Sequence, residues 1–148
     1  MFGFHKSTQQ VEVDVQDEFI ERVNAAAEDF LAVVPNHGAL DYSPQSVQAL
    51  DAVLDEVYQG RLSLTPMQTV GAAAYLYELC RRQYGGLYEV CDDDDPVVLV
   101  TGEPDFDVCL CAISKVEQRV RQGSTESLLA FFQRYVRAVD SRQSGTIN

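Results

Sequence analysis

Three polar residues of this sequence fall at helical spacing and together could perform chemistry. Glu78, Arg81 and Arg82 are three and four positions apart, so an α-helix places their side chains on one side. A glutamate there can act as a base or bind a cation, while an arginine clamps an anion. Tyr88, just after the expected helix, completes this alternative ligand site. The same spacing also suits a structural ion pair, and neither a nucleophile nor a histidine accompanies these residues.

A run of four consecutive aspartates is the second feature with chemical potential. Asp92, Asp93, Asp94 and Asp95 repel one another, and a bound cation or a basic partner would relieve that repulsion. A calcium loop needs alternating oxygen ligands, a turn glycine and a terminal glutamate, and this run lacks that spacing. The run therefore favours a solvated, charged turn that also meets a basic partner, and we predict no metal there.

The cysteines and histidines give little support for a metal or redox centre. Cys109 and Cys111 are two apart, so a strand would point both thiols to one face as a metal clip or redox pair. Free cysteines more often behave as small buried hydrophobes. The sequence has no C-x-x-C, and His5 and His37 are remote. Without a phosphate-binding or dinucleotide-binding glycine motif, we predict no cofactor and no catalytic residue, which disfavours an enzyme without excluding one.

Charge is distributed very unevenly along the chain. Of the 23 acidic residues, nineteen fall in residues 11–59, where Arg22 is the single base, and in residues 89–107, which have no base. The net charge of −12 argues against nucleic acid and anionic membranes as partners and for a basic protein surface. We therefore assign partner binding to Asp51, Asp55 and Glu56 on the second expected helix and to the aspartate run.

Apolar periodicity and turn residues predict the elements that position these groups. The expected helices cover about 14–34, 44–59, 66–84, 113–122 and 125–139, and the expected strands cover 87–91, 96–101 and 106–111. This order of three helices, three strands and two helices predicts an α+β fold with five helices on a three-stranded antiparallel sheet. Residues 11–141 would form one domain between disordered tails at 1–10 and 142–148.

Several stretches of the third expected helix and its neighbours help to orient this fold. Gly71 and the three alanines that follow make the helix thin, which lets another backbone approach and predicts a central position.

No apolar run approaches the roughly 18 residues of a membrane span, and the N-terminus does not read as a secretion signal. From these features we expect a cytoplasmic protein.

Three motifs resemble those of a family of small bacterial proteins of unknown function. They are LDYSPQSVQALD at 40–51, GAAAYLYELCRRQYGGLYE at 71–89 and KVEQRVRQGSTESL at 115–128. Two positions depart from the family pattern, because Tyr77 replaces a glycine and Tyr88 replaces a tryptophan. The resemblance implies a shared fold and brings no established reaction with it.

Three functions remain open at this stage. The first is an acidic, non-enzymatic binding protein, best exemplified by an immunity-type inhibitor that occludes the basic site of a bacterial toxin. The second is a small enzyme or ligand-binding domain centred on Glu78, Arg81 and Arg82. The third is a self-associating subunit whose last helix pairs with a copy of itself through Leu128, Phe131, Phe132 and Tyr135. The sequence does not define the oligomeric state.

Overall fold

The computed structural model describes residues 2–91, 95–123 and 126–148, with side chains from residue 15 onward. These residues form an α+β fold, as the sequence predicts. The helices are α1 (Phe2–Leu31), the short 3₁₀ helix η1 (His37–Ala39), α2 (Ser46–Tyr58), α3 (Pro66–Tyr84), α4 (Ala112–Gln122) and α5 (Leu128–Asp140). The strands are β1 (Leu87–Val90), β2 (Val97–Thr101), β3 (Val108–Leu110) and β4 (Gly145–Ile147).

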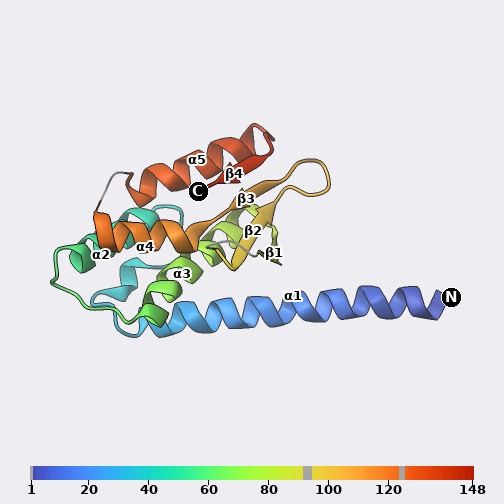
Figure 1. Cartoon of the computed structure of the whole chain (residues 1–148), viewed down its shortest axis with the longest axis horizontal. Helices are drawn as coiled ribbons and strands as arrows, with labels where there is room; N and C mark the ends of the chain where they lie inside the picture. The colour runs from blue at the N-terminus through green and yellow to red at the C-terminus, as the bar shows by residue number, and fades with distance from the viewer. Residues whose placement is uncertain (1, 92–94, 124–125) are drawn as a thin grey trace.

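Helix α3 is the centre of the structure, which confirms the position expected from its small residues. Its start is fixed by a capping box, in which Thr65 and Gln68 satisfy each other's backbone N–H groups, and Pro66 occupies the first turn. A Cβ added at Gly71 would lie 2.5 Å from the carbonyl oxygen of Ala26, so α1 and α3 touch backbone to backbone there. Figure 1 shows α3 between α1 on one side and α4, α5 and the sheet on the other.

The sheet has strand order β1-β2-β3-β4, with β1 and β4 at its edges. Strands β1, β2 and β3 pair antiparallel, as predicted, and β4 adds a parallel strand beside β3. The strand at 145–147 lies in a segment expected to be a disordered tail. That expectation is wrong because Ile147 is buried opposite Leu110 and Cys111 donates its backbone N–H to Ile147 at 2.9 Å.

Three helix starts differ from the sequence-based expectation. Helix α1 begins at Phe2 and ends at Leu31, instead of covering about 14–34. Ser43 does not cap α2: it forms a local turn in which its backbone N–H and hydroxyl both donate to Asp41, and the helix begins three residues later. Ser127 caps α5 through the backbone N–H of Ala130. At α5 the start depends on which of several nearby serines bonds a backbone N–H of the helix, and at α2 Ser43 bonds to Asp41 in place of the helix.

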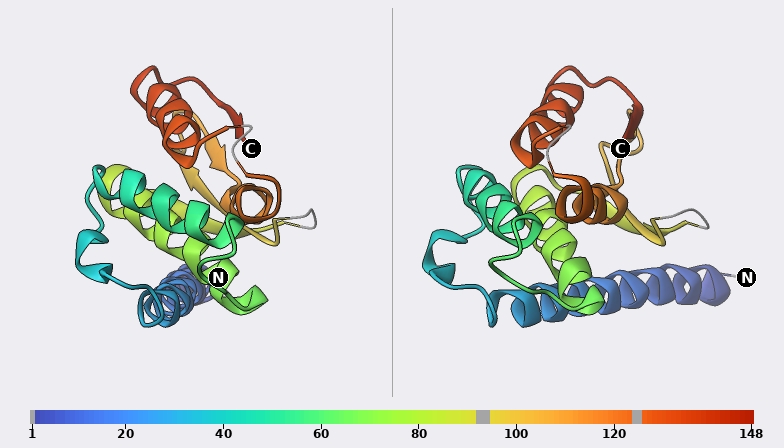
Figure 2. Two further views of the ribbon diagram at one scale, coloured as in Figure 1. Left: turned by 90° about the vertical axis from the view of Figure 1, so that its left-hand side faces the viewer. Right: turned by 60° about the vertical axis from the view of Figure 1, so that its left-hand side comes forward.

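The two faces of the sheet differ in burial. Leu99 and its cross-strand neighbours Tyr88 and Leu110 point into the main core under α3, α4 and α5. The opposite face is more open: Leu87 and Glu89 are exposed, and Cys109 is half-buried. Figure 2 shows α1 and α5 on opposite sides of the molecule, and Figure 1 shows the N-terminal half of α1 projecting past the sheet.

Candidate functional site

Glu78, Arg81, Arg82 and Tyr88 come together in the structure around the Glu78 carboxylate, which is fully buried. Its Oε2 accepts hydrogen bonds from Arg81 Nε and from the Tyr88 hydroxyl, each at 2.7 Å. Its Oε1 accepts from Arg81 Nη2 and Asn24 Nδ2 at 3.0 Å and, at 3.3 Å, from Arg82 Nε. Every lone-pair direction of the carboxylate is therefore directed at a donor from α1, α3 or β1.

The electrostatics of this cluster favour a charged, inert carboxylate. Burial acts to raise the pKa of Glu78, but hydrogen bonds from Arg81, Tyr88 and Asn24 outweigh it and lower the pKa below its ordinary value. Burial, together with the hydrogen bond to Glu78, raises the pKa of Tyr88, so the phenol keeps its proton and donates it. A carboxylate with a lowered pKa and four donor residues is a poor proton acceptor.

The polar network continues away from Glu78 into the segment before α2. Arg82 Nη2 donates to Asn24 Oδ1 at 2.6 Å, and its guanidinium lies 3.8 Å from the Tyr42 ring centroid. Tyr42 stacks on Tyr75 at 4.5 Å, and the Tyr75 hydroxyl pairs with Ser46 Oγ at 2.7 Å. The side chains thus close on one another. This is the arrangement of a structural network that ties α1, α3 and β1 together.

The acids assigned to partner binding on α2 form ion pairs with arginines of the same chain. Arg119 of α4 is buried, and its Nε and Nη2 pair with Asp51 Oδ1 at 3.0 Å and Asp55 Oδ1 at 3.3 Å. Asp51 Oδ1 also accepts the backbone N–H of Leu128 at 2.9 Å, so this carboxylate joins α2 to the last turn of α4 and to the first residue of α5. Glu56 pairs with Arg61. Asp55 and Glu56 keep side-chain exposures of 43% and 47%, so partner binding at this helix face stays a prediction.

Asp95, the last residue of the aspartate run, is buried and bonded to the start of α4. Asp95 is buried, and its two oxygens accept from the backbone N–H and the hydroxyl of Ser114 at 2.9 and 2.6 Å. It therefore caps the first turn of α4 from outside the helix, where the helix dipole favours an anion. This corrects its assignment to a solvated turn. Asp92, Asp93 and Asp94 lie outside the described residues.

The apolar residues expected to drive self-association are core residues. Leu128, Phe131 and Tyr135 are fully buried, and Phe132 is 6% exposed. Tyr135 also pairs with Thr101 of β2 through its hydroxyl at 2.8 Å. These side chains hold α5 on the sheet, so they cannot form a dimer interface in the folded chain.

The open face of the sheet gathers three acids that the sequence-based site omitted. Glu89 of β1 hydrogen-bonds with Glu103, which lies on the β2–β3 connection. That hydrogen bond, burial, and the charges of Glu103 and Asp107 raise the pKa of Glu89 above its ordinary value. The ion pairs formed within the described parts of the chain include none of these three acids. We call Glu89, Glu103 and Asp107 the sheet-face acids.

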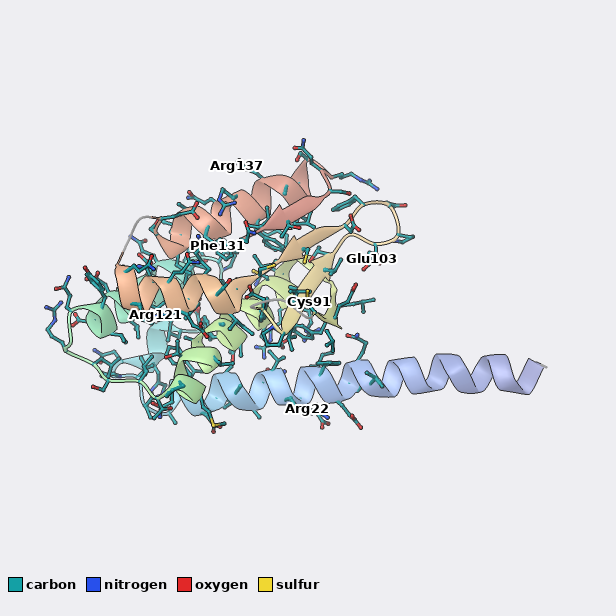
Figure 3. The ribbon with its side chains drawn as sticks, viewed as in Figure 1. Arg22, Cys91, Glu103, Arg121, Phe131 and Arg137 are labelled. Atoms are coloured by element: carbon teal, nitrogen blue, oxygen red, sulfur yellow. The ribbon has the colours of Figure 1, made fainter. Side chains whose placement is uncertain are left out.

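Among the described residues, no lysine or arginine forms an ion pair with a sheet-face acid. In Figure 3, Glu103 lies at the projecting β2–β3 connection, while Arg22, Arg121 and Arg137 lie apart on α1, α4 and α5. Asp105, on the same β2–β3 connection, pairs with Arg142 at 3.0 Å, and both side chains are exposed. Crowded carboxylates therefore meet one another here in place of a base.

Burial disfavours the thiolate form of Cys80, Cys109 and Cys111. Cys109 and Cys111 hydrogen-bond with each other, and burial raises the pKa of both, that of Cys111 to about 12. Burial also raises the pKa of Cys80, which is fully enclosed. Metal binding and nucleophilic attack both need a thiolate, which these environments disfavour. Within the described ranges, no group of three or more His, Cys, Asp or Glu side chains is arranged to hold a metal ion.

An apolar pocket of about 190 Å³ lies between α1, α3, β2 and α4. Phe19, Val23, Val70 and Ile113 form much of its wall. The one phenol there, Tyr77, is already used, because its hydroxyl donates to Val97 O at 2.7 Å and accepts from Ala112 N at 2.9 Å. The charged residue on the wall is Arg22, which pairs with Glu18 at 3.5 Å, and the rest of the pocket surface is apolar.

The chain matches no protein-family model, and searches of curated proteins and of solved structures find no match either. In the part of the chain that the structure describes, no helix is long and apolar enough to cross a membrane.

Sequence reasoning identified the Glu78 cluster but missed the sheet-face acids and the role of Arg119. The acid block at 89–107 is evident in the sequence, but no local signal separates Glu89, Glu103 and Asp107 from the aspartate run. Their proximity depends on how the β2–β3 connection folds back toward β1. Arg119 is 68 positions from Asp51, so only the packing of α4 on α2 reveals their pairing.

Proposed function

We propose that this protein is an acidic binding protein that docks a basic partner protein through the open face of its sheet. The mode of action would be that of an immunity-type inhibitor, which occludes a cationic site on a toxin. The observation that supports the proposal best is the contact between the carboxyls of Glu89 and Glu103, beside Asp107, with no base paired to any of the three in the described structure.

Crowded carboxylates are unfavourable in the free protein and become favourable when a cation lies between them. The hydrogen bond to Glu103, burial, and the charges of Glu103 and Asp107 raise the pKa of Glu89, so its charged form is disfavoured in the free protein. A lysine or arginine of a partner would offset the repulsion among these carboxylates and favour the charged form of Glu89. The surrounding charge of −12 would also steer a basic protein toward the surface and speed its association.

The contrast between the sheet-face acids and the remaining acids supports the choice of this surface. Asp51, Asp55 and Asp95 are committed to internal contacts, and Glu78 is enclosed by its own donors. No observed feature favours Glu78 as a ligand site over a structural role. The sheet-face acids differ because their side chains are exposed and form no ion pair with a lysine or arginine in the described residues.

A pair of charge-matched variants tests the proposal. The sheet-face variant replaces Glu89 and Glu103 with Gln and Asp107 with Asn. The helix variant replaces Glu21 and Glu28 with Gln and Asp29 with Asn on exposed positions of α1. Both changes raise the net charge by the same amount, so any difference between them reports position and not total charge.

The measurement is capture of proteins from a lysate of the producing organism at low salt, followed by association kinetics with the captured protein across ionic strengths. We expect a basic protein to bind the wild type and the helix variant, and to bind the sheet-face variant at least tenfold more weakly. Equal loss in both variants would indicate nonspecific attraction. Equal binding to all three proteins would refute docking at the sheet face.

A further inference from the structure

The exposed edge of β1 carries a contact that imitates a neighbouring strand. Gln16 of α1 donates from Nε2 to the Tyr88 carbonyl oxygen at 2.7 Å and accepts the Tyr88 backbone N–H through Oε1 at 3.1 Å. An adjacent antiparallel strand makes the same pair of hydrogen bonds to one residue of an edge strand. The side-chain amide of Gln16 thus occupies a strand-pairing position.

The rest of this edge is suited to receive an extended segment. By strand alternation, the backbone of Val90 points the same way as that of Tyr88. The side chains of Leu87 and Val90 are 51% and 71% exposed. Edge strands are often protected by prolines, lysines or bulges, whereas in the described residues this one lies against α1, whose Gln16 pairs with Tyr88 and whose N-terminal half projects beyond the body.

Charge selects the kind of segment that fits. Glu89 lies on this strand, and Glu103 and Asp107 are its neighbours. A second copy of the chain paired edge to edge would bring two copies of this acidic surface together, which is unfavourable. A strand with lysine or arginine on the same face would neutralise it.

We infer that the β1 edge accepts an extended segment of a basic partner protein, whose backbone replaces the Gln16 amide at Tyr88. The inference rests on the proposed function and specifies its mode of binding. Because side chains alternate along a strand, the segment would present basic residues to Glu89 and its neighbours and apolar residues to the side of Val90. Gln16 then acts as a cover that the partner displaces.

The probe for this inference is a blocked synthetic peptide of alternating lysine and valine. A second peptide of the same sequence carries backbone N-methyl groups on alternate residues, which removes its pairing donors without changing its charge. We expect the wild type to bind the unmodified peptide at least tenfold more tightly than the methylated one. Hydrogen exchange at the Tyr88 amide, followed by NMR, would remain slow when the unmodified peptide replaces Gln16.

Variants of Gln16 provide the second arm. Gln16→Ala removes the competing amide, so it should bind the unmodified peptide about tenfold more tightly and exchange its Tyr88 amide faster when free. Gln83→Ala is the matched control, because Gln83 makes one long surface contact of 3.3 Å to Tyr42 O. The comparison of the two peptides on the wild type holds even where Gln16→Ala folds poorly.

The outcomes separate this inference from the proposed function. Equal binding of both peptides to the wild type would overturn strand addition, while loss of that binding in the sheet-face variant would leave the proposed function standing. Absence of binding by either peptide would overturn both. Dimerisation of Gln16→Ala in sedimentation, without peptide binding, would assign the edge to a second copy and overturn the basic partner.

Discussion

Replacement of Glu78 by glutamine tests whether the buried cluster stabilises the fold or is kept for another purpose. Gln has nearly the same volume as Glu. The change therefore removes the charge and replaces one acceptor oxygen with an NH2 donor, without opening a cavity. Glu78 is fully buried, whereas Arg81 and Arg82 have side-chain exposures of 26% and 38%. The two arginines can therefore turn toward water when the carboxylate is lost.

The size of the effect follows from the contacts. Glutamine keeps one acceptor oxygen for Asn24 and Arg82, but its amide N–H groups face the donors of Arg81 and Tyr88. Hydrogen bonds to a charged group contribute roughly 1.5–3 kcal/mol each, and the partial exposure of the arginines reduces their share. We expect a net loss of about 2–4 kcal/mol in the free energy of unfolding. For a chain of this size that is about 5–15 °C in Tm.

Urea unfolding followed by circular dichroism is the appropriate assay, because the chain has no tryptophan. Glu18→Gln is the matched control. Glu18 pairs with Arg22 at 3.5 Å across one helical turn, and the two side chains are 64% and 74% exposed. That variant should change the free energy of unfolding by less than about 0.5 kcal/mol.

A result in which Glu78→Gln matches Glu18→Gln would refute the argument that the cluster stabilises the fold. A variant more stable than the wild type would go further. It would show that Glu78 is retained at the expense of stability, as residues of binding and catalytic sites often are, and would revive a ligand site there.

Three further predictions follow from other contacts. Two hydrogen bonds from Arg134, opposed by burial and helped by Lys115, lower the pKa of Glu126 to about 2. The charged Glu126 therefore stabilises the fold fully above its ordinary pKa of 4.5, and this stabilisation disappears as the pH falls through about 2. In pH-dependent unfolding, Glu126→Gln should reduce the loss of stability over this acidic range. Gly71→Ala should lower the free energy of unfolding in urea by about 1–3 kcal/mol, although alanine has the better helix propensity, because its Cβ would lie 2.5 Å from the α1 backbone. Unchanged stability would show that α1 and α3 can move apart without cost. Asp51→Asn should lower the free energy of unfolding by about 2 kcal/mol or more, because it weakens the pairing of the buried Arg119. Asp55→Asn should lower it less, because the Asp55 side chain is 43% exposed and that of Asp51 is 20% exposed.

Local signals in the sequence predicted much of the fold. The Thr65-Pro66 start of α3, the small residues after Gly71 and the three antiparallel strands depend on short-range rules, and the structure confirms them. The strand Gly145–Ile147 was missed because its apolar content is a single buried isoleucine, and its pairing with β3 depends on a crossover through two helices.

The candidate site was predicted in part, and the reason again lies in the range of the contacts. Glu78 and Arg82 share a helix, so their pairing follows from spacing. The pairing of Asp51 with Arg119 joins separate helices and is invisible in the sequence. Counting acids along the chain identified regions of high charge, but it did not distinguish a carboxylate consumed by an internal arginine from one left exposed.

The buried tyrosines make the folded state its own optical reporter. Tyr75, Tyr77, Tyr88 and Tyr135 are fully or almost fully buried, and each phenol pairs with another group. Burial raises the pKa of all four above the ordinary value of 10, so the folded chain holds them neutral in alkaline solution and loses stability as the pH rises beyond that value. The ultraviolet absorbance of tyrosinate therefore appears at these positions only as molecules unfold, which allows alkaline unfolding to be followed without an added dye or label.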